Sequence, residues 1–340
     1  MNVGILGAGA MGGTHARAFA KVAGVQVAAV SSRNLAKAQT LADAVGEGAV
    51  ATTDDLAIIR DPNIDAVAIT LPTHLHKPLT LAALQAGKPV LLEKPFALNV
   101  PDCDAMLTAQ AQTGTLLMIG HTLRFWPEYV ALEKFIKSNA LGKPMAAMAT
   151  RLSQLPAWAS WFTNPELSGG AVLDLMVHDL DALNWLFGTP KTVYARGHQA
   201  KPKLWNHIMA TLDYGDMHGF AEGSLFMPEG YPFTMTLKVV CEQGVIEFGF
   251  KASGVSVDMG SVSSLMAYQA GRATPIAVEP GDAYENQITY FVDCVRNKRA
   301  PQRGTPEQAR LAVACSNAAC ESLETGRLVE LAAFQNYQRN

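Results

Sequence analysis

Hydrophobic positions in the first third of the chain alternate between short apolar runs and amphipathic stretches. The apolar runs predict strands, and the stretches with apolar residues every three or four positions predict helices. Strands are expected at 3–6, 25–30, 66–70, 89–92 and 116–119, and helices between the first two strands and at 34–45, 54–60, 75–86 and 101–113. Strands that alternate with helices indicate a doubly wound parallel sheet, which we expect over residues 1–120.

The pattern changes after residue 120. Helices are expected near 128–138 and at 171–187, and strands at 145–152, 192–197, 207–213, 217–226, 233–241 and 245–250. Turn signals join several of these strands directly, which is typical of antiparallel pairing. We therefore predict an α/β protein whose second domain, residues 121–340, is an α+β domain with a mostly antiparallel open sheet.

Composition and charge narrow the classes of function. The 340 residues exceed what one hydrophobic core usually spans, which supports two domains. The net charge of −3 lacks the positive excess that nucleic-acid binding needs. No apolar run is long enough to cross a membrane, and no leader segment is recognisable before the first strand. A small-molecule ligand is the expected partner, without nucleic acid or membrane.

The chain has five cysteines, an odd number without a CxxC pair. Neither a disulfide framework nor a metal site is therefore expected. A reducing, cytoplasmic location fits this pattern.

A glycine-rich segment, GAGAMG, links the first strand to the first helix. Its GxGxxG spacing is typical of the dinucleotide-binding turn of a Rossmann domain. Gly7 allows the tight turn, Gly9 lets the backbone approach a pyrophosphate, and Gly12 lets helix and strand pack closely. We take these three glycines, with Ala10 and Met11, as cofactor contacts.

The end of the second strand bears on the choice of cofactor. NAD-specific sites usually place a carboxylate about 20 residues beyond the glycine turn, to bind the ribose 2′-hydroxyl. Here the stretch is Ser31-Ser32-Arg33, whose hydroxyls and guanidinium can bind a 2′-phosphate. NADP(H) is therefore favoured and NAD(H) stays possible. The alternative is that Arg33 and Lys37 are ordinary solvated charges.

The helix expected at 171–187 carries a line of titratable side chains. Asp174, His178 and Asp181 stand at i, i+4 and i+7, the spacing at which helix side chains share a face. Histidine, with a usual pKa of about 6.5, moves protons near neutral pH, and a carboxylate can fix its tautomer. The alternative is that acidic residues in a first turn only complement the helix dipole.

The remaining face of that helix is apolar, and we expect it to be buried against the sheet. Its members are Leu173, Val177, Leu180 and Leu183 or Asn184.

Two turns follow strands of the first domain, where ligands of doubly wound sheets bind. One runs from Leu71 and Pro72 to His76, and the other is Glu93-Lys94-Pro95. With the glycine turn and the Gly169-Gly170 helix that carries Asp174, His178 and Asp181, they resemble the glucose-fructose oxidoreductase/inositol dehydrogenase (Gfo/Idh/MocA) family. The resemblance covers nearly the whole chain, including a tail with Tyr284, Asn286 and Phe291 on one helix and Thr305 opening another.

The resemblance implies roles for these residues. Lys94, Asp174 and His178 form the catalytic group, although Lys94 by itself would most often be a solvated loop lysine. Asp181 is a further carboxylate near the substrate. His76 lies near the nicotinamide, and Glu93 and Pro95 shape their loop, in which many members carry a cis bond before this proline. The cofactor contacts then also include Leu71, Pro72, His76, Glu93 and Lys94.

Substrate contacts are expected in both domains. Besides the catalytic group and Asp181, they include Arg124, Trp158 and Trp161. The tryptophans lie in a proline-flanked segment and can stack on a sugar ring, or equally anchor a loop. The resemblance also implies that the exposed face of the second sheet makes a homodimer or homotetramer.

The expected function is hydride transfer between a nicotinamide cofactor and a secondary alcohol or ketone of a sugar, inositol or related polyol. His178 would accept the hydroxyl proton, Asp174 would orient the imidazole, and Lys94 would stabilise the alkoxide, so Lys94 and His178 are expected to converge on one hydroxyl. Alternatives are an NAD-dependent glycosidase, a dihydrodiol or tetrapyrrole-like reductase, and a non-enzymatic sugar sensor. The sensor is disfavoured because it needs no proton relay.

Overall fold

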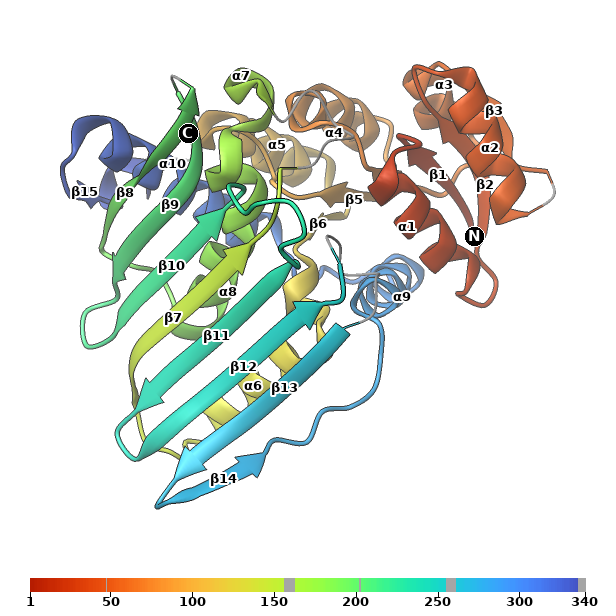
Figure 1. Ribbon diagram of the computed structural model, residues 1–340. Coiled ribbons are helices and arrows are strands. Elements are labelled where there is room, and N and C mark those ends of the chain that lie inside the picture. The colour runs from red at the N-terminus through yellow and green to blue at the C-terminus, as the bar shows by residue number, and fades with distance from the viewer. Residues whose placement is uncertain (47, 156–162, 202, 255–260, 336–340) are drawn as a thin grey trace. The chain divides into compact units, whose positions relative to one another are not determined.

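The computed structural model describes residues 1–46, 48–155, 163–201, 203–254 and 261–335 (Figure 1). The chain forms two compact units. In the described residues, the first comprises Met1–Trp126 and Gly281–Arg310, and the second comprises Pro127–Pro280 and residues 311–335. The chain thus returns to its first unit after residue 280, whereas the division expected from sequence has one boundary, at residue 120.

The first unit contains a parallel six-stranded sheet with the order β3-β2-β1-β4-β5-β6. Its strands are β1 (Asn2–Leu6), β2 (Gln26–Ser31), β3 (Val50–Thr52), β4 (Ala66–Ile69), β5 (Val90–Glu93) and β6 (Leu117–Gly120). This is the order of a dinucleotide-binding Rossmann sheet, and the predicted fold of this part is confirmed. The sequence pattern missed only β3, because a three-residue edge strand whose Val50 is exposed carries little periodicity.

The first unit contains the helices that connect these strands and one helix, α9, from much later in the chain. They are α1 (Ala10–Ala20), α2 (Leu35–Val45), α3 (Asp55–Arg60), α4 (His76–Gln85), α5 (Val100–Thr113) and α9 (Ala283–Arg296), with short 3-10 turns η1 (Thr73–Leu75) and η2 (Thr122–Phe125). Helix α9 packs its apolar face on α1, where the rings of Phe19 and Phe291 meet edge to face at 6.2 Å. Burial of that face explains why α9 belongs with residues so distant in sequence.

The second unit contains a nine-stranded sheet in the described residues, with the order β14-β13-β12-β11-β7-β10-β9-β8-β15. Its strands are β7 (Pro144–Leu152), β8 (Thr192–Lys201), β9 (Leu204–Asp213), β10 (His218–Ser224), β11 (Thr234–Cys241), β12 (Gly244–Ala252), β13 (Ser261–Gln269), β14 (Arg272–Pro275) and β15 (Val329–Glu330). Only the β7–β10 pair is parallel, so the predicted mostly antiparallel sheet is confirmed. Strands β13 to β15 were not predicted, because they are polar, exposed or very short.

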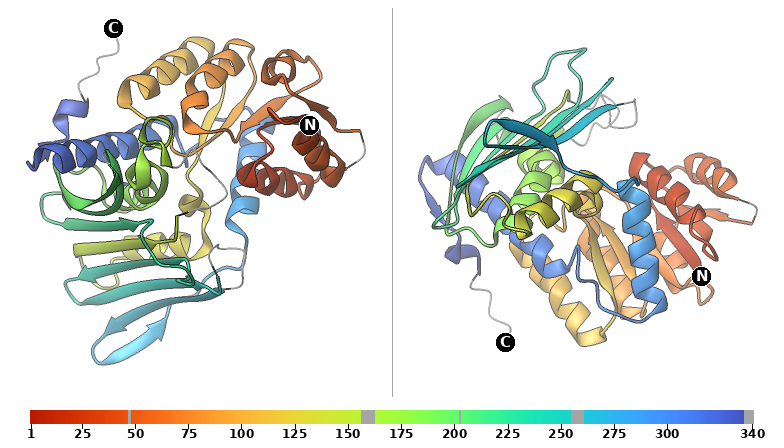
Figure 2. Two further views of the ribbon diagram at one scale, coloured as in Figure 1. Left: turned by 45° about the horizontal axis from the view of Figure 1, so that its top comes forward. Right: turned by 90° about the horizontal axis from the view of Figure 1, so that it is seen from below.

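Helices α6 and α8 cover one face of this second sheet (Figure 2). The helices of this unit are α6 (Pro127–Lys137), α7 (Pro165–Ser168), a π-helical turn η4 (Val172–Met176), α8 (Val177–Phe187), α10 (Pro306–Thr325, which begins in the first unit) and α11 (Ala332–Gln335). The apolar face expected for 171–187 is buried, since Leu173, Val177, Leu180, Leu183 and Asn184 are all at most 6% exposed.

A buried ion pair fixes α8 to the sheet. The guanidinium of Arg151 on β7 donates from Nε to Asp179 Oδ2 at 2.8 Å and from Nη2 to Asp179 Oδ1 at 3.0 Å. Burial raises the pKa of the Asp179 carboxyl, and the charge of Arg151 opposes that rise. Two hydrogen bonds in one plane fix both side chains, and Asp179 directly follows His178 in the chain.

We predict that Asp179→Asn lowers the free energy of unfolding by about 3–5 kcal/mol, because it removes the carboxylate that pairs with the buried charge of Arg151. Urea unfolding provides the measurement. The exposed Asp216→Asn in the same unit serves as the control, with an expected change within about 0.5 kcal/mol. A loss at Asp179 no larger than the control would show that the pair does not fasten the helix.

Candidate functional site

The glycine turn between β1 and α1 is built on one close approach. A side chain at position 12 would place its Cβ 1.8 Å from the carbonyl oxygen of Gly7, so only glycine fits there. Gly7 itself has φ +109°, and a Cβ on it would lie 2.8 Å from Thr70 O. Gly9 is different, because it is exposed and no atom lies within 4 Å of the place of its Cβ. The space beside Gly9 is therefore open to a ligand.

Thr70, which follows β4, holds this turn in place. Its hydroxyl lies 3.0 Å from Leu6 O and 2.9 Å from Gly7 O, and its amide donates to Leu6 O at 2.8 Å. Helix α1 then starts at Ala10, and its N-cap, Gly9, offers no side-chain hydrogen bond. The first amides of α1 are thus left to water or to an anionic ligand.

The end of β2 lies beside the glycine turn. Gly7 N donates to Ser31 O at 3.1 Å, and Ser31 is fully buried, whereas Ser32 is half-buried and Arg33 is exposed. The Ser32 hydroxyl accepts from Asn34 N at 3.3 Å. The Ser31 hydroxyl donates to the carboxylate of Asp55, a residue that the sequence argument did not consider.

The loop after β5 is anchored by Glu93. Its buried carboxylate accepts hydrogen bonds from His15 Nε2 at 2.7 Å and from the Lys94 amide at 3.1 Å. Burial acts to raise the pKa of Glu93, but the hydrogen bond and charge of His15 and the charge of Lys94 outweigh it, so the pKa is lowered. The Lys94–Pro95 bond is cis, and the Lys94 side chain is half-buried.

His76 joins two loops of this site. Its Nδ1 lies 2.9 Å from Pro95 O and its Nε2 lies 2.9 Å from Leu71 O. Burial lowers the pKa of His76, although both hydrogen bonds act against this effect. Both ring nitrogens face carbonyl oxygens of the protein, so the role seen for His76 is to hold the turn at Leu71 and Pro72 against the Pro95 loop.

Two further polar side chains of the first unit are buried. Gln287 of α9 is fully buried, and a Cβ built on Gly120 would lie 3.3 Å from Glu93 Oε1 and 3.5 Å from Gln287 Nε2. Arg124 in η2 is 1% exposed, and its carbonyl accepts from Arg303 Nη1 at 3.1 Å. Sequence reasoning missed His15 and Gln287. Only the position of His15, one turn after Gly12, hinted that it faces the sheet.

In the second unit, the predicted line of titratable residues is divided by burial. Between residues 170 and 184, every side chain is buried except those of Asp174 and His178, which are half-buried. Asp181 is fully buried. Burial raises the pKa of the Cys315 thiol on α10 to about 12, and the charge of Asp181 adds to that rise. Asp174 lies in the π-helical turn, whose extra residue per turn breaks the straight i, i+4, i+7 line.

Trp158 and Trp161 lie outside the described residues. Among the residues that are described, no group of three or more His, Cys, Asp or Glu side chains could hold a metal ion. Within the same residues, no helix combines the length and apolar character needed to cross a lipid bilayer.

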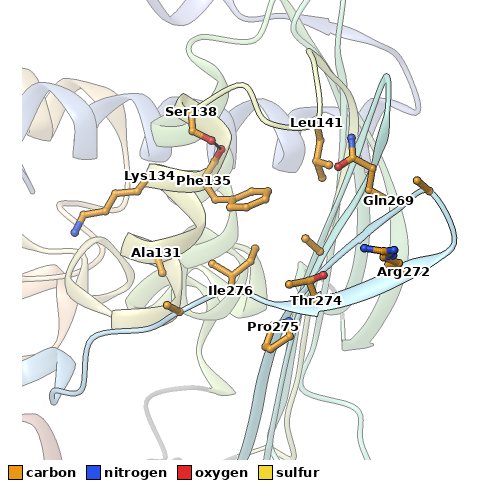
Figure 3. A pocket seen from close by; sticks show the side chains of 13 residues that line it. Ala131, Lys134, Phe135, Ser138, Leu141, Gln269, Arg272, Thr274, Pro275 and Ile276 are labelled. Atoms are coloured by element: carbon orange, nitrogen blue, oxygen red, sulfur yellow. Dashed lines mark hydrogen bonds between the residues drawn. The ribbon is translucent and has the colours of Figure 1, made fainter.

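A cavity of about 850 Å³ lies elsewhere in the second unit, between α6 and the β13–β14 hairpin (Figure 3). Phe135, Leu141 and Ile276 line it, and the amine of Lys134 points away from it. No predicted site residue lines this cavity, and its wall offers no proton-transfer group of the kind that Asp174 and His178 provide.

The sheet order and the glycine turn define a dinucleotide-binding Rossmann domain. Residues 1–121 match the model of an oxidoreductase family with an NAD-binding Rossmann fold, and residues 129–247 match the model of the GFO/IDH/MocA C-terminal domain. The chain belongs to the Gfo/Idh/MocA family, as its motifs predicted.

One relative agrees with this assignment, and two solved structures share the fold. Inositol 2-dehydrogenase 1 of Saccharopolyspora erythraea is 32% identical over 318 residues, which cover 88% of this chain and 87% of that protein. The aldose-aldose oxidoreductase of Caulobacter crescentus, solved with glycerol, has a TM-score of 0.84 at 24% identity, covering 97% of this chain and 99% of its own. An oxidoreductase of Agrobacterium radiobacter, solved with NAD⁺, L-tartaric acid and magnesium, has a TM-score of 0.81 at 20% identity, covering 98% and 99%.

Two glycines of the turn are predicted to respond differently to substitution. Gly9→Ala should leave the free energy of unfolding within about 0.5 kcal/mol, because its Cβ enters open space, yet weaken NADH binding about tenfold by blocking the pyrophosphate. Gly12→Ala should cost about 1–3 kcal/mol of stability, because its Cβ meets Gly7 O. Thermal melts and fluorescence titration with NADH measure both. Unaltered NADH binding by Gly9→Ala would contradict the assigned ligand path.

Proposed function

We propose that the protein is an NAD(P)-dependent dehydrogenase that acts on a secondary alcohol of a sugar, inositol or related polyol. One observation carries this proposal: in a chain of this oxidoreductase family, the segment 170–184 is buried except for a carboxylate and an imidazole, Asp174 and His178. Such a pair suits proton transfer. The similarity to an inositol 2-dehydrogenase over most of both chains supports a polyol as substrate.

In this proposal the residues divide the work of an alcohol oxidation. His178 accepts the proton of the substrate hydroxyl, Asp174 orients the imidazole, and Lys94 stabilises the negative charge that develops on oxygen. The bound nicotinamide supplies the hydride acceptor. In the direction of reduction, His178 returns the proton. Asp181 and Arg124, both buried, are proposed to support the substrate site from within the protein.

The residues present fit a nicotinamide dinucleotide. The open space at Gly9 and the first amides of α1 suit the pyrophosphate. Leu71, Pro72 and the Glu93–Lys94 loop stand after neighbouring strands β4 and β5, where the cofactor of a doubly wound sheet lies. NADP(H) stays the preferred prediction on the grounds of Ser32 and Arg33, with NAD(H) as the alternative.

Two broader properties belong to the same proposal. The face of the second sheet opposite α6 and α8 carries partly exposed side chains such as Met209, Tyr268 and Glu247, and we propose that it forms the contact of a homodimer or homotetramer.

All five cysteines are free, which supports the prediction of a reducing, cytoplasmic location.

A panel of sugars and inositols, followed at the absorbance of NAD(P)H, tests the function. The proposal expects net formation of NAD(P)H with at least one cyclic polyol. Hydrolysis of a glycoside without net reduction of the cofactor would instead identify a glycosidase. Binding of a sugar without any turnover would identify a sensor, and turnover only with planar, non-sugar substrates would identify the other class of reductase.

The proposed proton relay makes a prediction for two variants. His178→Ala and Lys94→Ala should each lower kcat by about 10²- to 10⁴-fold while NADH binding is retained. Steady-state kinetics and NADH titration are the measurements. The control is His198→Ala, which alters an exposed histidine on β8 of the same unit and should leave kcat unchanged. Near-normal turnover of either variant would remove that residue from its role.

The cofactor prediction has its own test. Ser32→Asp should shift the preference toward NAD(H), because a carboxylate there repels a 2′-phosphate and binds a 2′-hydroxyl. The dissociation constants of NADH and NADPH are measured for both forms of the protein. A wide preference for NADH in the unaltered protein would show that Ser32 and Arg33 do not decide the choice of cofactor.

A further inference from the structure

A carboxylate from a distant part of the chain reaches the end of β2. Ser31 is the last residue of that strand and pairs with Leu6 of β1 and Thr52 of β3. Its side chain is fully buried and its carbonyl accepts from the Gly7 amide, so Ser31 lies against the glycine turn. Its hydroxyl donates to Asp55, the first residue of α3. Asp55 therefore lies close to where the ribose of a bound adenosine is expected.

The hydrogen bond changes what Ser31 can offer a ligand. A serine hydroxyl has one proton, and here that proton is directed at the carboxylate of Asp55. The remaining lone pairs of the hydroxyl can only accept. A 2′-phosphate needs hydrogen-bond donors, so Ser31 is unsuited to bind it, and only Ser32 and Arg33 of the three residues still can.

No ion pair neutralises the charge of Asp55. In the described residues, its one hydrogen-bonding partner is Ser31, and no lysine or arginine forms an ion pair with it. The neighbouring carboxylate of Asp54 is engaged differently, since it caps α3 by accepting from Leu56 N at 2.9 Å and Ala57 N at 3.1 Å. Asp55 is half-buried, so water screens its charge less than that of a fully exposed carboxylate.

We propose that Asp55 is a determinant of cofactor choice in this protein, and that it shifts the preference toward NAD(H). Its carboxylate takes the place of the acidic residue that β2 lacks: it repels a 2′-phosphate, while a 2′-hydroxyl carries no charge to repel. Asp55 thereby opposes Arg33, and the preference of the chain is the balance of the two. The proposal rests on the proposed function only in requiring that a nicotinamide dinucleotide binds at the glycine turn.

The test compares cofactor binding by Asp55→Asn and by the unaltered protein, without substrate. Asparagine retains an oxygen that accepts from Ser31 but loses the charge. Fluorescence titration with NADH and NADPH should show the ratio Kd(NADPH)/Kd(NADH) falling about fivefold, the effect expected of one unit charge near a phosphate in water. A merely structural role would weaken both cofactors alike and leave the ratio unchanged.

Matched variants sharpen the result. Asp54→Asn removes a charge one residue away and keeps an N-cap of equal quality, so its ratio should stay within about twofold of the unaltered protein. Asp55→Glu retains the charge and should retain the ratio, and Asp55→Ser replaces Asp55→Asn if the latter does not fold. An unchanged ratio in the neutral Asp55 variants, or an equal shift in Asp54→Asn, would overturn the proposal. Binding of neither cofactor by the unaltered protein would overturn the dinucleotide site itself, whereas lack of turnover with polyols would not affect this comparison.

Discussion

The close approach of the Gly7 carbonyl to Gly12 is the constraint on which the first unit depends. It lets α1 start directly behind β1. The hydroxyl of Thr70, the residue after β4, donates to the same carbonyl oxygen. The strands β1, β2 and β4 thereby end around one turn whose tip, at Gly9, is open. A site for an extended, negatively charged ligand follows from backbone geometry alone, and the side chains around it then decide which dinucleotide binds.

In the second unit, burial fixes the orientation of the helix that carries the proposed site. The Arg151–Asp179 pair and the apolar face of α8 prevent the helix from turning about its axis, so His178 on α8 and Asp174 in the preceding turn η4 remain half-buried. Proton transfer depends on the orientation of the two side chains, and here packing fixes that orientation. In both units, buried contacts set the geometry of the groups proposed to bind a ligand.

Much of this arrangement was predictable from sequence. The glycine turn, the doubly wound sheet, the antiparallel sheet and the buried face of 171–187 follow from local spacing, which periodicity reports directly. The contacts of His15 with Glu93, Ser31 with Asp55, and α9 with α1 join residues far apart in the chain, so no local pattern announces them. The π-helical turn was equally hidden, because one extra residue in a turn leaves the apolar pattern nearly unaltered.

Transfer of deuterium tests the central claim most directly. An inositol or sugar that the enzyme oxidises is labelled with deuterium at the carbon bearing the reacting hydroxyl, and the reduced cofactor is analysed by mass spectrometry. The account predicts that the label appears in the nicotinamide ring in one-to-one ratio with the ketone formed. Reduced cofactor without deuterium, or a labelled product with no net change in the cofactor, would contradict direct hydride transfer from a secondary alcohol as the reaction of this protein.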